Sequence, residues 1–271
     1  MTLYPKSSIL LLENITHTRK ETFMNIVIFD TETTSLNKPF CYNIGYIIRN
    51  EQNEILVAKD FVVEQIWHNL PLFSTAYYSE KRPLYINAMK SHKTIMKKFG
   101  YICQEMIRDF KNFEVACAYA YNSTFDEKVF DFNCDWFKVN NPFDNIPIYD
   151  IRGNVHNFLL DKNFFNFCER YEQFTDSGNY STTAETLYRY LINDADWSED
   201  HTALSDSLIE NAILEESFLS GAKINTDYPT KRSIERRTEK TLHIQTAEQI
   251  DYYFSYEKIR INKDKTEIKL K

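Results

Sequence analysis

The stretch Asn25–Thr34, NIVIFDTETT, decides the fold that this sequence predicts. Its apolar, β-branched run is typical of a buried strand, and it ends in two carboxylates that lie one residue apart. Because side chains alternate along a strand, Asp30 and Glu32 point to the same side. Two acids on one side of a strand require a cation between them. Taken alone, the stretch fits equally well with a polar turn after a core strand, so the other ligands must come from elsewhere in the chain.

Composition bounds the class of protein. The chain of 271 residues is 43% hydrophobic, which is enough for one large domain or for one domain with a small appendage. Its five cysteines are widely spaced and form no C-x-x-C pair, which favours reduced core cysteines over a disulfide or zinc framework. No apolar run reaches membrane length, and the ILLL run at residues 9–12 is too short for the core of a signal peptide. We expect a soluble, cytoplasmic protein with no membrane partner.

The formal net charge of −7 argues against a protein that coats nucleic acid by bulk electrostatics, but not against an enzyme that carries metal ions. Residues 222–271 contain 12 Lys and Arg against 8 Asp and Glu, a balance of +4 that leaves −11 for the remainder. This basic end is a candidate contact surface, although a mixed-charge solvated segment is the commoner explanation.

Hydrophobic periodicity predicts the elements of the first half. Strands are expected at 42–48, 54–58 and 60–63, where they form an antiparallel meander with the first strand. Residues 64–92 are expected to be an ordered loop region with short helices. Apolar positions at spacings of three and four predict one amphipathic helix over 93–110.

The second half is expected to alternate strands and helices. Strands are expected at 115–120 and 146–150, helices from Ser123 or Thr124 and at 155–160, 181–191 and 203–219, and an irregular connection at 161–180. Strands followed by alternating helices and strands predict an α/β fold with a mixed sheet.

Three segments are expected along the chain. Met24 opens the first strand, so residues 1–23 are assigned to an N-terminal extension and residues 24–221 to the main domain. Residues 222–271 are expected to form a small basic α+β extension, with a helix that begins at Thr246 and a β-hairpin within 257–271. Such a hairpin could lie along a phosphate backbone. The interpretation that its lysines only protect the edge of a sheet is slightly favoured.

Further acids lie where a sheet could bring them to the first pair. Asp126 falls in the first turn of a helix that follows a strand, and Asp206 falls in the long helix. Oxygen ligands without thiolates suit Mg²⁺ or Mn²⁺ rather than zinc. His201 precedes Asp206 by five residues, a spacing that places both at one site only if His201 lies in the loop before the helix. A histidine beside a metal pair suits a general base.

Together these residues resemble the DnaQ-like, or DEDD, 3′–5′ exonucleases, in their histidine-containing subgroup, DEDDh. Three motifs over residues 24–220 carry the resemblance: Asp30-Thr-Glu32-Thr-Thr, Asn122-Ser-Thr-Phe-Asp126 and His201-Thr-Ala-Leu-Ser-Asp206. Each motif alone is weak or moderate, but their order on a strand, a helix start and a helix is specific. The resemblance implies a ribonuclease-H-like mixed β-sheet flanked by helices. It also implies two divalent ions, Mg²⁺ or Mn²⁺, held by Asp30, Glu32, Asp126 and Asp206.

The same resemblance implies an activity. The chain would hydrolyse phosphodiester bonds at the 3′ end of single-stranded nucleic acid, with DNA favoured, and would release 5′-mononucleotides by a two-metal mechanism. His201 would be the general base, so the catalytic set is this histidine with the four acids. The substrate-binding set implied by the resemblance is Thr31, Thr33, Leu36, Asn122 and Phe125.

This chain departs from the family pattern at two positions. Ser35 stands where the family often has Gly, and Tyr121 stands where it often has His. Neither position is a metal ligand, so the departures bear on substrate fit. The segment Tyr190–Asp194 imitates the third motif of the tyrosine-containing subgroup, but no long helix is expected after it.

Two other functions fit the same residues. An exoribonuclease or oligoribonuclease would use the same metal site, because the 2′-hydroxyl contacts that distinguish RNA are not readable from the sequence. A non-catalytic nucleic-acid-binding module of a replication complex could retain the fold. The expected partners are the 3′ end of single-stranded DNA or RNA, with a polymerase or a replication or repair complex as a further candidate.

Overall fold

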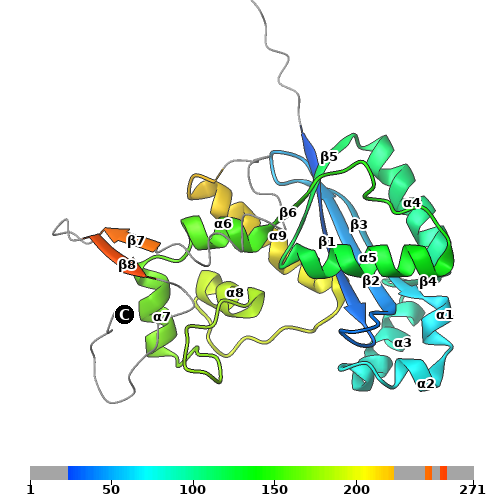
Figure 1. Cartoon of the computed structure of the whole chain (residues 1–271), viewed down its shortest axis with the longest axis horizontal. Coiled ribbons are helices and arrows are strands. Elements are labelled where there is room, and N and C mark those ends of the chain that lie inside the picture. Colours follow the sequence, from blue (N-terminus) through cyan, green and yellow to red (C-terminus); the bar gives the residue numbers. More distant parts are fainter. Residues whose placement is uncertain (1–23, 223–241, 246–250, 255–271) are drawn as a thin grey trace, which may run out of the picture.

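The computed structural model describes residues 24–222 and the backbone of residues 242–245 and 251–254. A six-stranded mixed sheet forms the centre, in the order β4-β3-β2-β1-β5-β6 (Figure 1). Its strands are β1 Asn25–Thr33, β2 Cys41–Arg49, β3 Ile55–Val63, β4 Ile95–Lys97, β5 Val115–Ala120 and β6 Ile148–Asp150. Strands β1 to β3 form the expected antiparallel meander, whereas β4, β5 and β6 pair in parallel with their neighbours.

Helices cover both faces of this sheet. They are α1 Glu64–Trp67, α2 Leu70–Phe73, the 3₁₀ turn η1 Ser79–Lys81, α3 Arg82–Lys90, α4 Phe99–Asn112, α5 Ser123–Phe137, α6 Ile151–Phe158, α7 Lys162–Arg170, α8 Ala184–Ile192 and α9 Ala203–Leu219. The short helices in 64–92 and the bounds of α9 agree with the sequence prediction. The α/β class with a mixed sheet flanked by helices is therefore confirmed.

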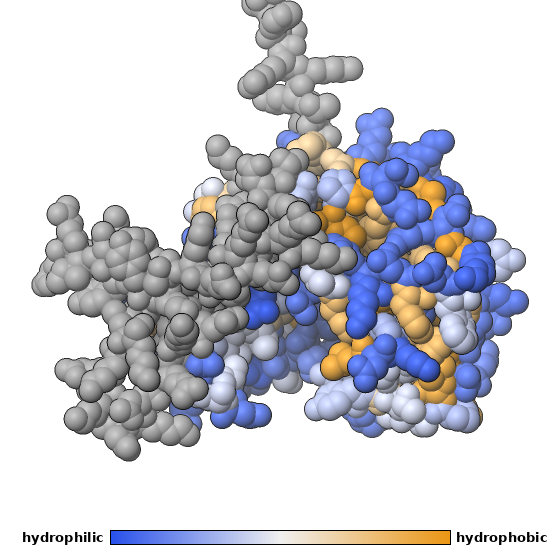
Figure 2. Space-filling view, in the orientation of Figure 1, coloured by the Kyte–Doolittle hydropathy of each residue, from blue (hydrophilic) through white to orange (hydrophobic). Residues whose placement is uncertain are grey.

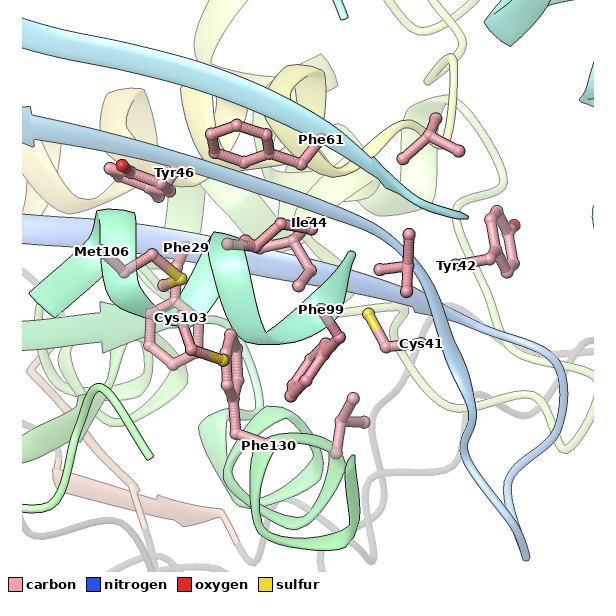
Figure 3. Packing of buried hydrophobic residues seen from close by; sticks show 14 of the residues in the cluster. Phe29, Cys41, Tyr42, Ile44, Tyr46, Phe61, Phe99, Cys103, Met106 and Phe130 are labelled. Carbon is pink, nitrogen blue, oxygen red and sulfur yellow. The ribbon is translucent and has the colours of Figure 1, made fainter. Parts of the chain in front are cut away.

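The alternation of β1 assigns its side chains to two separate cores. Val27 and Phe29 belong to the core that lies under α4 and α5 (Figure 3). Ile26 and Ile28 belong to the second core, which lies between the sheet and α6 to α9. Apolar contacts stabilise both layers because each side chain leaves water on folding. The even-numbered residues of β1 thus face α9, and this decides where Asp30 and Glu32 point.

Three sequence predictions about elements are wrong. Residues 95–97 form β4 instead of the first turn of a helix, because their backbone pairs with Phe61 to Val63 at the edge of the sheet. The expected connection 161–180 contains α7, whose Asp161 side chain accepts a hydrogen bond from the Phe164 N–H and caps it. Helix α6 begins at Ile151 rather than near 155, because Asp150 caps it through the Arg152 N–H. In each case a tertiary pairing or a cap outweighs the local pattern.

The remaining expectations concern the cysteines and the chain ends. All five cysteines are free and buried, as expected. No helix in residues 24–222 is long and apolar enough to cross a membrane. Strands β7 Leu242–Gln245 and β8 Asp251–Phe254 form an antiparallel pair that the sequence did not predict. The N-terminal extension, the expected helix start at Thr246 and the expected hairpin in 257–271 lie outside the described residues.

Candidate metal and catalytic site

Three of the four expected carboxylates come together on the α9 side of the sheet. Asp30 and Glu32 project from β1, and Asp206 projects from the first turn of α9. One carboxylate oxygen from each lies within 4.8 Å of the others. Because like charges at this separation repel, the arrangement is favourable only with protons or cations among the oxygens. Two separate elements therefore build one acidic cluster.

Strand β2 holds α9 against this cluster. Gly45 pairs with Asp30 across the strands, and both residues face α9. A Cβ added at Gly45 would lie 2.1 Å from the Leu204 nitrogen and 2.2 Å from the Ala203 carbonyl carbon. Only glycine allows the helix to approach this closely. The absence of a side chain at Gly45 thus determines how near Asp206 lies to Asp30.

Asn43, which pairs with Glu32, fixes the beginning of the same helix. Its Oδ1 accepts a hydrogen bond of 2.8 Å from the Ala203 N–H, an otherwise free donor of the first turn of α9. The Asn43 amide donates in turn to Asp60 Oδ1 at 2.6 Å, and Tyr85 donates to Asn43 Oδ1 at 3.0 Å. The two β2 residues opposite the two acids therefore position the helix that carries the third acid.

Asp126 reaches the site from the opposite layer. It lies in the first turn of α5 and is 2% exposed. The Thr31 hydroxyl, on the odd-numbered face of β1, donates to Asp126 Oδ1 at 2.6 Å. Asp30 and Asp126 interact electrostatically, but the oxygens of Asp126 are not within the 4.8 Å cluster. The helix start does not use Ser123 or Thr124 as a side-chain cap, because Asn122 occupies the cap in a left-handed conformation.

His201 lies in the loop before α9, as the spacing to Asp206 required. Its φ of 50° turns the chain sharply just before the helix. The imidazole, Glu199 and Asp206 each place one potential ligand atom within 4.8 Å of the others. Tyr78 stacks on the imidazole at 4.4 Å with an interplanar angle of 13°, and Lys81 donates to the Asp200 carbonyl oxygen. The helical segment 64–92 thus steadies the histidine loop from outside the sheet.

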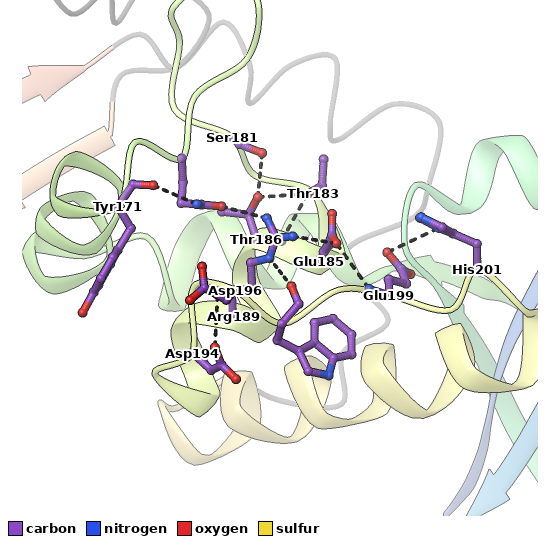
Figure 4. Close-up of polar contacts among 12 residues, drawn as sticks. Tyr171, Ser181, Thr183, Glu185, Thr186, Arg189, Asp194, Asp196, Glu199 and His201 are labelled. Atoms are coloured by element: carbon purple, nitrogen blue, oxygen red, sulfur yellow. Dashed lines mark hydrogen bonds and ion pairs between the residues drawn. The ribbon is translucent and has the colours of Figure 1, made fainter.

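Glu199 was not predicted, and it joins the site to α8 (Figure 4). One carboxylate oxygen lies 3.7 Å from His201 Nδ1. The Glu199 N–H donates to Glu185 at 3.3 Å, and Glu185 forms an ion pair of 2.9 Å with Arg189. Arg189 also donates to the Trp197 carbonyl oxygen at 2.6 Å. Helix α8 therefore holds the loop at two points, which restrains both Glu199 and His201.

Burial and mutual repulsion raise the pKa values of the clustered acids. Burial and the nearby Glu199 raise the pKa of Asp30 to about 7. Burial and Asp30 hold the pKa of Glu32 well above its ordinary value, although Lys81 opposes this. Burial and Asp30 also raise the pKa values of Asp126 and Asp206. Such shifts mark a site that would bind divalent cations, because cations stabilise the ionised carboxylates.

Glu210 is a further acid that the sequence analysis missed. It lies one turn after Asp206 on α9 and is 4% exposed. Burial raises its pKa, and the charges of Asp30 and Asp126 raise it further. Its spacing of four residues from Asp206 is the only sequence signal that it faces the same way.

The expected substrate residues surround the cluster in different ways. Leu36 is 72% exposed at the β1–β2 turn, where Lys128 donates to its carbonyl oxygen. Asn122 is exposed, Phe125 packs partly against the first core, and Thr33 is half-buried. The Thr31 hydroxyl is occupied by Asp126, so any substrate contact there would come from the backbone. Tyr190 of the competing third motif packs against Phe164 and Phe167 in the second core.

The donor set fits hard divalent cations. The three clustered residues offer only oxygen atoms, which suits Mg²⁺ or Mn²⁺. Asp206 Oδ1 is buried and has no hydrogen-bond partner within the described part of the chain. An orphaned buried carboxylate oxygen is costly unless a proton or an ion satisfies it. The three clustered acids therefore fit a divalent cation, whereas the part of Asp126 as a fourth ligand stays a prediction.

Comparison with solved structures identifies the fold. The nuclease domain of 3′hExo, a DEDDh family member bound to rAMP, matches with a TM-score of 0.51 and 14% identity, over 77% of this chain and 98% of that domain. The fold is that of DEDDh exonuclease domains. Exonuclease I, in a complex of SSB and exonuclease I with the inhibitor CFAM, matches with a TM-score of 0.50 and 14% identity, over 70% of this chain. This chain spans about 40% of that exonuclease I chain. No protein-family model and no curated protein matches the sequence.

Proposed function

We propose that this chain is a metal-dependent 3′–5′ exonuclease that removes 5′-mononucleotides from the 3′ end of single-stranded nucleic acid, with DNA favoured. The observation that carries the proposal is the convergence of Asp30, Glu32 and Asp206 within 4.8 Å, on a fold shared with DEDDh nuclease domains. Asp126 lies behind this cluster, and His201 lies beside it. The four acids are assigned to two divalent ions, Mg²⁺ or Mn²⁺.

Each residue of the site has a role in this proposal. Bound divalent ions would supply a water of lowered pKa and would neutralise charge on the leaving 3′ oxygen. His201 accepts the proton of the attacking water, and the stacked Tyr78 together with Glu199 restrains the imidazole for this task. Thr31 fixes the orientation of Asp126. Gly45 and Asn43 place Asp206 against Asp30.

The exposed residues around the cluster are assigned to the strand. Leu36 would pack against the last bases, while Thr33, Asn122, Phe125 and the backbone at Thr31 would contact the terminal nucleotide. An apolar wedge and a few polar groups suit an unstacked single strand. A cytoplasmic location and a polymerase or a replication or repair complex as partner remain predictions of the sequence.

Single-stranded oligonucleotides that carry a 5′ label provide the test. Incubation of DNA and RNA of one sequence with Mg²⁺ or Mn²⁺ should give a ladder that shortens from the 3′ end, and Asp30→Ala should abolish it. Asp135→Ala is a suitable control, because Asp135 is an exposed acid on α5 whose side chain has no hydrogen bond to the residues that the structure describes. A faster RNA ladder would make the chain an exoribonuclease. The absence of metal-dependent cleavage on both substrates would exclude a nuclease and leave a nucleic-acid-binding module.

A further inference from the structure

A cavity of about 430 Å³ shares only Asn122 with the residues assigned above to the substrate strand, and none of the clustered acids lines it. We call it the Arg152 cavity. Its walls come from the end of β5, the beginnings of α6 and α8, and the segment between α7 and α8. They include Tyr121, Asn122, Arg152, Asn179, Tyr180 and Thr182. This volume falls within the range of small-ligand sites, which is about 300–1,000 Å³.

Arg152 forms no ion pair within the described part of the chain, although its charge interacts with the neighbouring Asp150 carboxylate and opposes the rise in the pKa of that group that burial causes. Arg152 Nε is buried and has no hydrogen-bond partner among the described residues. The ion pairs of the described arginines involve Arg49, Arg108 and Arg189, but not Arg152. Asp150 is near, but its Oδ1 accepts from the backbone N–H groups of Arg152 and Asn122, at 2.8 and 3.0 Å. A buried guanidinium nitrogen without an acceptor is costly, so the site favours an anionic ligand.

The other lining groups suit a nucleotide better than a simple anion. Tyr121 offers a half-buried aromatic ring, and its hydroxyl donates to the Thr182 carbonyl oxygen. The Tyr180 ring is 4% exposed and packs on Phe165 and Phe174, so it forms a fixed wall of the cavity. Asn179 Oδ1 is buried without a hydrogen-bond partner in the described chain, and the Asn122 side chain is exposed. The Tyr121 ring for stacking, amides for base edges and a guanidinium for phosphate together match one nucleotide.

The cavity is also connected to the acidic cluster. Asn122 lines the cavity and caps α5, and Asp126 lies one turn further along that helix. Asp150 ties the Asn122 backbone to the beginning of α6, where Arg152 lies. A strand whose terminal phosphodiester reaches Asp126 would therefore pass Asn122 on its way into the cavity.

We propose that the Arg152 cavity binds a nucleotide of the substrate strand on the 5′ side of the terminal one, with its phosphate on Arg152. This inference rests on the proposed nuclease function and deepens it, because it makes the cavity a second subsite. Strands long enough to fill the cavity would be held more tightly than dinucleotides.

The test measures binding without catalysis. A full-length Asp30→Asn variant in EDTA is titrated with fluorescent single-stranded oligothymidylates in which one linkage at a time is a neutral methylphosphonate. We expect one internal position to weaken binding. Introducing Arg152→Gln into the Asp30→Asn protein should weaken its binding of the unmodified strand by about tenfold, because one charge-assisted contact is lost. In this double variant, a neutral linkage at the sensitive position should no longer weaken binding. The slope of log affinity against log salt should fall by about 0.7.

A matched control uses another arginine. Arg170 on α7 is exposed and does not line the cavity, so Arg170→Gln should leave the position of the methylphosphonate effect unchanged. If Arg152→Gln leaves the affinity and the positional effect intact, the subsite is refuted, even when the wild-type protein cleaves DNA. If the Arg152-dependent effect is present but wild-type protein does not hydrolyse the strand, the subsite stands and the nuclease function fails.

A free nucleotide distinguishes the strand from the released product. Thymidine 5′-monophosphate is titrated into the same two proteins. One contrary result is that the mononucleotide binds in an Arg152-dependent way while no neutral linkage in the oligonucleotide weakens binding. That result would make the cavity a product site and would overturn the proposal. Sensitivity of the oligonucleotide with weak mononucleotide binding supports it.

Discussion

Gly45→Ala is expected to separate catalysis from folding. A Cβ at this position would lie 2.1 Å from the Leu204 nitrogen and 2.2 Å from the Ala203 carbonyl carbon, and both are backbone atoms that cannot rotate away. To lengthen the 2.1 Å separation to an ordinary contact of 3.4 Å, the beginning of α9 must retreat from β2 by about 1.3 Å. Asp206 lies in that first turn and moves with it, away from Asp30.

The expected cost follows from this displacement. A misplacement of about 1 Å at a catalytic group can lower the rate by about 10²-fold, because the reacting groups lose their alignment. Overpacking at a buried site costs about 1–3 kcal/mol in the free energy of unfolding. In a domain of this size that loss lowers Tm by about 2–4 °C per kcal/mol. The variant should therefore stay folded while kcat falls by about two orders of magnitude.

The assay combines kcat on a 5′-labelled oligonucleotide, Mn²⁺ binding by calorimetry and thermal unfolding. Gly153→Ala is the matched control, because a Cβ at Gly153 in α6 meets no atom within 4 Å. Alanine at that helical position should be neutral or stabilising by up to about 1 kcal/mol and should leave kcat unchanged. A Gly45→Ala protein with wild-type kcat and wild-type Mn²⁺ affinity would refute the role assigned to the close approach of β2 and α9.

Three further predictions concern the acidic cluster and its histidine. In EDTA, Asp30→Asn should be more stable than the wild type at pH 7.5. The pKa of Asp30 is raised from 3.8 to about 7 in the folded protein, so the wild type loses stability as the pH rises from 3.8 to about 7. Urea unfolding should therefore show a smaller difference in stability between the two proteins at pH 4.5 than at pH 7.5. His201→Ala should lower kcat by about 10²–10⁴-fold while calorimetry still detects Mn²⁺ binding, and loss of that binding would show that His201 is a ligand instead. Glu199→Gln should lower kcat by about 10-fold or more, because Glu199 positions His201. KM should change little, because the Glu199 backbone still ties the loop to Glu185. A change confined to KM would contradict the role of Glu199 in positioning His201.

Much of the site could be predicted from local sequence because its acids lie on regular elements. Alternation along β1 required Asp30 and Glu32 to share a side, and the 203–219 periodicity placed Asp206 in a first helical turn. The five-residue spacing required His201 to lie in a loop. These inferences hold because strand and helix geometry is set by the backbone, independently of the rest of the fold.

Other features depend on neighbours that are distant in sequence. Residues 95–97 have a helical pattern, yet they pair with β3 because that edge offers unsatisfied backbone groups. Glu199 gains its position through Glu185 and Arg189, and no motif marks it. The Arg152 cavity requires β5, α6 and α8 to meet.

The sequence by itself therefore determined which residues offer carboxylates and toward which side of their own element they point. Only the tertiary structure decided how far apart those carboxylates lie. The Gly45 contact with Leu204 and the Asn43 bond to Ala203 set that separation, across about 160 residues of chain. The physical reason is that side-chain direction follows from local backbone dihedrals, whereas the distance between two elements follows from the packing of atoms that only the complete fold brings into contact.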